Sequence, residues 1–208
     1  MEVLASLGTS LNEFRAILDF GCGPGRVIRQ FYRLHNLIPS ARIYGTDINP
    51  DFIDWCRRKL VFAEFEQSDA LPPLPYLDEQ FDFIYALSVF THLTLPQQQF
   101  WIDELSRILK PGRHLLITTQ GESFLHNLGR DDQRKFKAGE LVVVGEEFAG
   151  DPSAYGRCGA YHPPGYIERK IAKGFELARF VPVGAIRPGS HGAMDQDQYF
   201  LRKPIDRS

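Results

Sequence analysis

Short apolar runs alternate with segments in which apolar residues recur every three or four positions, from residue 16 to about residue 120. An apolar run is typical of a buried strand, and the longer spacing is typical of a helix that packs one face on a sheet. The alternation predicts an α/β fold with a mostly parallel sheet and helices on both faces. The strands are predicted at 16–18, 42–46, 63–67, 81–87 and 115–119, and the helices at 27–34, 50–60 and 97–109.

Two local expectations follow from the same pattern. The first helix is expected to carry its apolar face on Val27, Phe31 and Leu34, which recur at helical spacing. The third helix is expected to end at Pro111 and Gly112, because these residue types stop helices.

Residues 121–165 interrupt the alternation with Gly, Pro, charged and aromatic residues around one predicted strand at 141–144. An irregular stretch this long is usually functional or disordered, so we expect an elaboration or lid that covers the substrate. Helical spacing returns at 166–173, and two neighbouring strands are predicted at 175–183 and 198–201. Without a repeat or linker, residues 1–208 are expected to form a single domain, with residues 15–120 as a cofactor-binding core.

Composition narrows the function classes. The 24 Lys and Arg residues against 26 Asp and Glu give a net charge of −2, so no global positive field attracts nucleic acid, and we expect a small-molecule acceptor. No apolar run approaches the roughly 20 residues that cross a bilayer, and no secretory pattern opens the chain. Cys22, Cys56 and Cys158 form neither a C-x-x-C pair nor a zinc spacing. We expect a cytoplasmic monomer or homodimer without a metal or a membrane partner.

Three glycines occupy alternate positions between Asp19 and Gly25, where the first strand must turn into a helix. Glycine lets the backbone approach a ligand, and the helix N-terminus offers free N–H groups to a nucleoside or an anion. The same glycines are also ordinary turn residues, so the loop alone does not establish a ligand-binding site. Asp47 follows about 20 residues later at the end of the second strand, where an acid accepts ribose hydroxyls. Its alternative role is to cap the next helix, for which Asn49 is better placed.

A nicotinamide-binding loop reads G-x-G-x-x-G, but Arg26 stands at the position of the last glycine. The loop instead reads D-x-G-x-G-x-G and resembles that of the class I methyltransferases that use S-adenosylmethionine. Four further segments resemble motifs of that family in the family's order: Tyr44–Ile48, Ser68–Ala70, Phe81–Ser88 and Arg107–Gly112.

The resemblance implies S-adenosylmethionine as the cofactor and a Rossmann-like, doubly wound, seven-stranded sheet whose last strand is antiparallel and lies beside the fifth. It also implies that Asp47 binds the ribose and that Asp69 meets the adenine amino group. The cofactor contacts are expected from Asp19, Gly21, Cys22, Gly23, Gly25, Asp47, Ile48, Asp69, Ala70 and Leu87. The family usually carries a longer helix before its first strand, so the start of the chain is expected to be truncated.

The residues that act on the acceptor are harder to predict, because a sulfonium methyl is already activated and needs mainly an aligned nucleophile. His92, just after the fourth strand, is placed to orient or deprotonate a hydroxyl, unless its role is structural. Tyr161 and His162, held by the two prolines that follow, are the other candidates at the mouth of the site, unless they form a rigid turn. Gln120 is either an acceptor contact or a cap of the next turn.

The expected reaction is methyl transfer to an oxygen or nitrogen of a small polar acceptor. Residues 174–202 resemble methyltransferases of carbohydrate and secondary-metabolite pathways, which favours a sugar or a secondary metabolite. One alternative is a non-catalytic partner protein that binds S-adenosylmethionine. The other is a nicotinamide-dependent oxidoreductase, which Arg26 disfavours.

Overall fold

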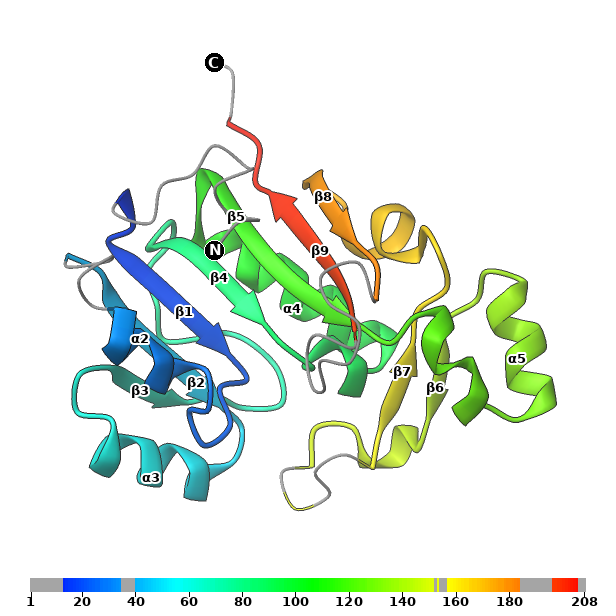
Figure 1. The fold of residues 1–208 in the computed structure, drawn as a ribbon, viewed down its shortest axis with the longest axis horizontal. Helices are drawn as coiled ribbons and strands as arrows, with labels where there is room; N and C mark the ends of the chain where they lie inside the picture. The colour runs from blue at the N-terminus through cyan, green and yellow to red at the C-terminus, as the bar shows by residue number, and fades with distance from the viewer. Residues whose placement is uncertain (1–12, 35–39, 152, 154–156, 184–195, 206–208) are drawn as a thin grey trace.

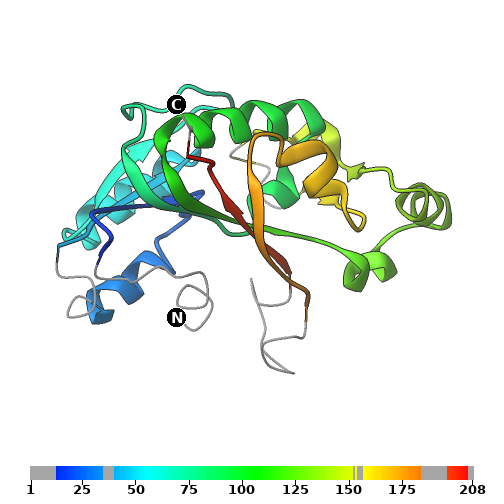
Figure 2. The ribbon, with the colours of Figure 1, turned by 90° about the horizontal axis from the view of Figure 1, so that it is seen from above.

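A seven-stranded sheet with helices on both faces forms the body of the protein (Figure 1, Figure 2). The computed structural model describes residues 13–34, 40–151, 153, 157–183 and 196–205. The strands of this sheet are β1 (Ala16–Phe20), β2 (Arg42–Asp47), β3 (Glu64–Gln67), β4 (Phe81–Ala86), β5 (Leu109–Thr119), β8 (Glu176–Val181) and β9 (Asp197–Arg202). The α-helices are α2 (Ile28–Leu34), α3 (Pro50–Lys59), α4 (Leu95–Ile108) and α5 (Arg130–Lys137).

The strand order is β3-β2-β1-β4-β5-β9-β8. Strands β1 to β5 are parallel, and β9 is antiparallel to both β5 and β8. This topology confirms the predicted fold class, including the antiparallel last strand beside the fifth. In such a sheet the carboxyl ends of the parallel strands meet along one edge, where α/β proteins bind ligands.

The sheet buries a different apolar cluster on each face, because neighbouring residues of a strand point to opposite sides. Leu18 and Ile84 pack with α4 and with the π-helical turn Ile167–Ile171 on one face. Ile17 and Phe83 pack with α2 and α3 on the other. Figure 2 shows α4 and α2 on opposite sides of the sheet.

Two local expectations are wrong. Ile28, not Val27, is the buried residue at the start of α2, while Val27 precedes the helix and is 38% exposed. Pro111 and Gly112 do not end α4, which stops at Ile108 and continues directly into β5. The Gly112 amide donates to the Lys203 carbonyl at 2.8 Å, so a residue far along the chain keeps this Pro-Gly pair within the strand.

Residues 121–165 begin with the 3₁₀-helix Glu122–Asn127 and α5, and they continue into the two-stranded antiparallel sheet of β6 (Val142–Val144) and β7 (Gly159–Tyr161). Leu128, Phe136 and Val142 form a small apolar cluster of their own. This region extends beyond the carboxyl ends of β4 and β5 (Figure 1). None of the helices described is long and apolar enough to cross a bilayer.

Asp82 links β1, β4 and β5 near the amino-terminal ends of these strands, away from the edge where their carboxyl ends meet. Its Oδ2 accepts from the backbone amides of Arg15 and Ala16 at 2.7 and 2.9 Å, and its Oδ1 accepts from Lys110 Nζ at 2.8 Å. Burial raises the pKa of Asp82, but Lys110 and the two amides outweigh it and hold the pKa below the ordinary 3.8. A carboxylate with a lowered pKa stabilises the folded state at neutral pH, and this contribution is lost as the pH falls through the folded pKa.

The Asp82→Ala substitution should therefore lower the free energy of unfolding at pH 7 by about 3 kcal/mol, because two backbone donors and an ammonium lose their acceptor. Urea unfolding of both proteins measures the difference. Asp78→Ala is the matched control, since Asp78 is 77% exposed and its ion pair with Arg107 should contribute less than about 1 kcal/mol. Equal losses for the two variants would contradict the role given to Asp82.

Candidate active site

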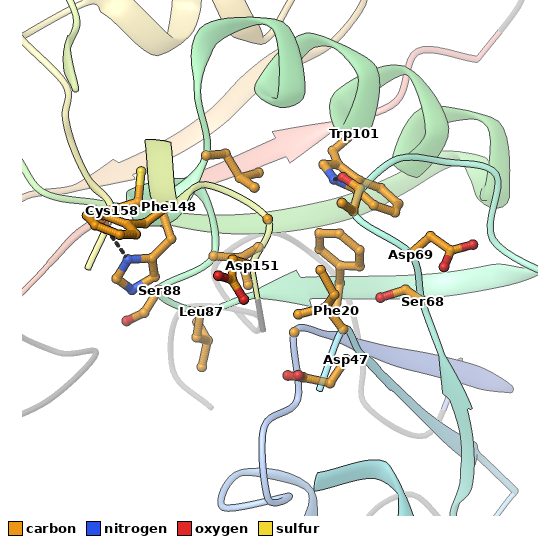
Figure 3. A pocket seen from close by; sticks show the side chains of 17 residues that line it. Phe20, Asp47, Ser68, Asp69, Leu87, Ser88, Trp101, Phe148, Asp151 and Cys158 are labelled. Carbon is orange, nitrogen blue, oxygen red and sulfur yellow. Dashed lines mark hydrogen bonds between the residues drawn. The ribbon is translucent and has the colours of Figure 1, made fainter. Parts of the chain in front are cut away.

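A cavity opens at the carboxyl edge of the sheet, between the ends of β1, β2 and β4 and the region that follows β5 (Figure 3). The residues that line it are Phe20, Gly21, Asp47, Ile48, Ser68, Asp69, Ala70, Leu87, Ser88, Val89, His92, Leu93, Trp101, Phe148, Gly150, Asp151 and Cys158. One wall thus comes from the loops after the strands, and the other comes from residues 148–158.

The glycine loop is fixed to the end of β2. The amides of Gly21 and Cys22 both donate to the Thr46 carbonyl, at 2.8 and 2.9 Å. Gly21 has a φ of +75°, and a Cβ on it would lie 2.3 Å from Val89 Cγ2, so a larger residue does not fit. Gly23 has a φ of +51° and faces open space, with nothing within 4 Å of the position of a Cβ. The loop is therefore tight at its base and open at its tip.

Asp47 sits beside that open tip at the end of β2. Its Oδ2 accepts from the Gly23 amide at 2.7 Å and its Oδ1 from the Asn49 amide at 2.9 Å. Burial raises the pKa of Asp47, and these two amides oppose the rise. Asn49, not Asp47, caps α3, since its side chain accepts from the amides of Asp51 and Phe52. Each carboxylate oxygen of Asp47 has a second lone pair for a ligand hydroxyl.

Asp19 is a buried acid at the end of β1, directly before the glycine loop. Its Oδ2 has no hydrogen-bond partner among the described residues, and burial raises the pKa of this carboxyl to about 8. The Tyr85 side chain opposes this rise only in part, so the position suits a cationic ligand group that would stabilise the ionised form. Asp19 does not itself line the cavity.

Ser88 lies two residues beyond the end of β4 and lines the cavity with a φ of +59°, a conformation that costs energy in most residues other than glycine. Its amide donates to Thr118 Oγ1 at 2.8 Å, and its hydroxyl donates to Gln196 Oε1 at 3.0 Å. Thr118 Oγ1 also donates to Gln196 Oε1 at 2.6 Å. These bonds join the ends of β4 and β5 to the residue that precedes β9.

His92 is the histidine that lines the cavity. It ends the 3₁₀-helix Phe90–His92, and its Nδ1 lies 2.6 Å from the Cys158 carbonyl, the contact that is dashed in Figure 3. A carbonyl oxygen can only accept, so Nδ1 carries the hydrogen and Nε2 is the acceptor nitrogen of the neutral ring.

The other predicted acceptor residues lie together, but outside the cavity lining. The Gln120 carbonyl accepts from the His162 amide at 2.8 Å, and Gln120 and Tyr161 form an isolated bridge. His162 is 1% exposed, its Nε2 contacts Gln98 Oε1 at 3.2 Å, and burial lowers its pKa to about 3. The structure therefore places His162 in the protein interior and not at the mouth of the cavity.

Six of the ten predicted cofactor residues line the cavity: Gly21, Asp47, Ile48, Asp69, Ala70 and Leu87. Asp19, Cys22, Gly23 and Gly25 lie behind that lining. Trp101, on α4, also lines the cavity, and its ring centroid lies 4.7 Å from that of Phe20. No sequence signal identified Gly150, Asp151 or Cys158.

Known proteins resemble this chain in sequence over about half of its length. Residues 17–112 match a family model described as a methyltransferase domain. A fatty-acid O-methyltransferase of Mycolicibacterium smegmatis is 34% identical over 108 residues, which cover 51% of this chain and 37% of that protein. A tRNA (carboxymethyluridine(34)-5-O)-methyltransferase of Arabidopsis thaliana is 35% identical over 116 residues, which cover 55% of this chain and 26% of that protein. Both matches thus span less than half of the relative.

The likeness in fold extends over the whole chain. The crystal structure of a SAM-dependent methyltransferase from Methanosarcina mazei matches with a TM-score of 0.71, covers 99% of both chains and is 18% identical in sequence.

Replacing Asp47 with Ala should weaken the binding of S-adenosylhomocysteine by about 30-fold, because a charged acceptor for ligand hydroxyls is lost. Titration calorimetry measures the affinity, and a thermal melt of the free protein checks that the loop still folds. Asp51→Ala is the matched control, since Asp51 is an exposed acid in the first turn of α3. Unchanged affinity in Asp47→Ala would remove this residue from the site.

Proposed function

We propose that the chain is a class I S-adenosylmethionine-dependent methyltransferase and that it methylates an oxygen or nitrogen of a small polar acceptor, such as a sugar or a secondary metabolite. The observation that supports this most strongly is the continuity of one cavity. Asp47 and Asp69 line one part of it, and His92, Phe148 and Asp151 line another. A cofactor and an acceptor bound in a single cavity can meet.

The residues at the glycine loop fit the cofactor in three ways. Gly23 leaves open space beside Asp47, which offers two carboxylate oxygens to the ribose. Asp69 and Ala70 line the cavity where the adenine would bind. Asp19 offers a buried, unpartnered oxygen to the ammonium of the methionine portion. When bound, S-adenosylmethionine supplies an activated methyl group on a sulfonium.

Residues 121–165 are proposed to form the lid over the acceptor. A Cβ on Gly150 would lie 3.0 Å from the Ala70 side chain, so this segment rests directly on the adenine side of the cavity. Phe148 adds an aromatic surface to the wall, and the Arg157 guanidinium lies over its ring, 3.7 Å from the centroid. A fixed aromatic surface suits a ring-shaped acceptor. Tyr155, another aromatic residue of this segment, lies outside the described residues.

His92 is proposed as the general base when the acceptor is a hydroxyl. Its Nδ1 hydrogen bond to the Cys158 carbonyl places the acceptor lone pair of the neutral ring on Nε2, the atom that would take the hydroxyl proton. As the oxygen–methyl bond forms and the sulfur–methyl bond breaks, that proton passes to Nε2 and later to solvent. Because Cys158 directly precedes β7, the lid would hold the base in its working tautomer.

Experiments can distinguish the proposed function from its alternatives. One relative is named for a tRNA acceptor, whereas the net charge of −2 of this chain favours a small molecule. A binding protein without catalysis would take up the cofactor and release no product. The three buried, free cysteines fit the reducing cytoplasm, where we place the protein.

Methyl transfer should be detected when the protein is given labelled S-adenosylmethionine and a panel of sugars, phenols, amines, carboxylic acids and tRNA. We expect turnover with a hydroxyl or amine compound. Thermal melts with S-adenosylhomocysteine and with NADH give a second test, because a ligand that binds the folded state raises the midpoint. A rise with NADH alone would refute the methyltransferase assignment, and turnover of tRNA alone would refute the small-molecule acceptor.

With a hydroxyl acceptor, His92→Gln should lower kcat by about 100-fold, since general-base catalysis contributes roughly this much. The affinity for S-adenosylhomocysteine should stay within about threefold of the parent, because cofactor contacts remain. His126→Gln, an exposed histidine, is the control and should change neither quantity. A kcat equal to that of the parent would exclude His92 as the base.

A further inference from the structure

Two of the three cysteines, Cys22 and Cys56, lie close to the same peptide of the glycine loop. Cys22 belongs to the loop and is 7% exposed, whereas Cys56 belongs to α3 and is fully buried. Both sulfur atoms lie 3.5 Å from one oxygen, the carbonyl of Gly23. The two thiols are also within hydrogen-bonding reach of each other. Neither the fold nor the proposed methyl transfer requires two thiols at this place.

The Gly23 peptide links this thiol pair to the acid of the cofactor site. Its carbonyl accepts from the thiols of Cys22 and Cys56, while its N–H donates to Asp47 Oδ2 at 2.7 Å. The thiols therefore help to position the loop tip against Asp47 from the side away from the cavity. Oxidising the pair removes both S–H donors and draws the loop toward α3.

The pair is unequal in acidity. The neighbouring Cys22 thiol and, to a smaller extent, the positive charge of Arg29 lower the pKa of Cys56 against the opposing effects of burial and of the Asp47 charge. Arg29 itself is held beside the loop, where its side chain donates to the carbonyls of Gly25 and Pro24 at 3.3 Å. The thiolate is the reactive form of cysteine, so Cys56 is the nucleophile of the pair.

We propose that Cys22 and Cys56 form a reversible disulfide when the protein meets a peroxide, and that this disulfide weakens cofactor binding. The Cys56 thiolate attacks the peroxide, the oxygen–oxygen bond breaks, and the products are a sulfenic acid and, after protonation, water or an alcohol. The Cys22 thiol then attacks the sulfenic sulfur, and water leaves as the sulfur–sulfur bond forms. The two sulfurs together lose two electrons to the peroxide, and a small dithiol reductant restores both thiols.

The second half of this proposal rests on the proposed function, because it concerns cofactor binding. The formation of the disulfide does not, since it can be measured without any ligand. The two halves therefore fail separately. If the reduced protein bound no S-adenosylhomocysteine, both the cofactor assignment and the proposed effect of the disulfide on cofactor binding would be refuted. The mass and thiol measurements would still show whether the disulfide forms.

The experiment treats the whole protein with hydrogen peroxide and then blocks the remaining thiols with an alkylating agent. Peptide mass spectrometry should find Cys22 joined to Cys56, with Cys158 alkylated. Calorimetry should find S-adenosylhomocysteine bound about tenfold more weakly than by the reduced protein, and dithiothreitol should restore the affinity. Three alkylated thiols after treatment would overturn the proposal, as would a disulfide that leaves the affinity unchanged.

Single variants separate the positioning role from a general effect on folding. Cys56→Ser keeps a hydroxyl donor for the Gly23 carbonyl, so the affinity should stay within about threefold of the reduced parent and should not respond to peroxide. Cys22→Ala and Cys56→Ala lose that donor and should bind more weakly even when reduced, with thermal melts to confirm folding. Cys158→Ser should still form the disulfide. A peroxide response that survives in Cys56→Ser would overturn the assignment.

Discussion

The anchoring of the glycine loop to the end of β2 is the constraint on which the site depends. The Thr46 carbonyl accepts from the amides of both Gly21 and Cys22, so the loop leaves β1 and turns at once over its neighbouring strand. This turn requires a positive φ at Gly21, and it brings the amide of Gly23 to the carboxylate of Asp47. The Thr46 carbonyl and the Asp47 carboxylate thus hold the loop residues Gly21 to Gly23 against the end of β2.

The parts of the structure that could be predicted are those with local causes. Apolar alternation gave the parallel strands, and asparagine and proline at the start of α3 gave its cap and first turn. The start of β5 could not be predicted, because Pro111 and Gly112 normally end a helix and only a hydrogen bond to distant Lys203 keeps them in the sheet. His162 was misplaced for the same kind of reason, since its partner Gln98 lies on α4.

The two walls of the cavity differ in how far a sequence can describe them. On the cofactor side, Asp47 was predicted from its spacing to the glycine loop and its place at the end of a strand, and Asp69 from the resemblance of Ser68–Ala70 to a family motif. On the lid side, Phe148 and Asp151 reach the cavity through a region with little regular structure, where no periodicity relates position to direction. The turn at Gly150 brings this region against Ala70, and that contact joins segments that lie far apart in the chain.

This asymmetry limits what the relatives reveal about the acceptor. The family model matches residues 17–112, which include β1 to β4 and the start of β5, but none of residues 148–158. The two curated relatives are named for a fatty acid and for a tRNA, although they resemble this chain to a similar degree. Similarity over about half of the chain therefore does not identify the acceptor. We expect the choice of acceptor to depend on the wall where His92 contacts the Cys158 carbonyl and the Arg157 guanidinium lies over the Phe148 ring.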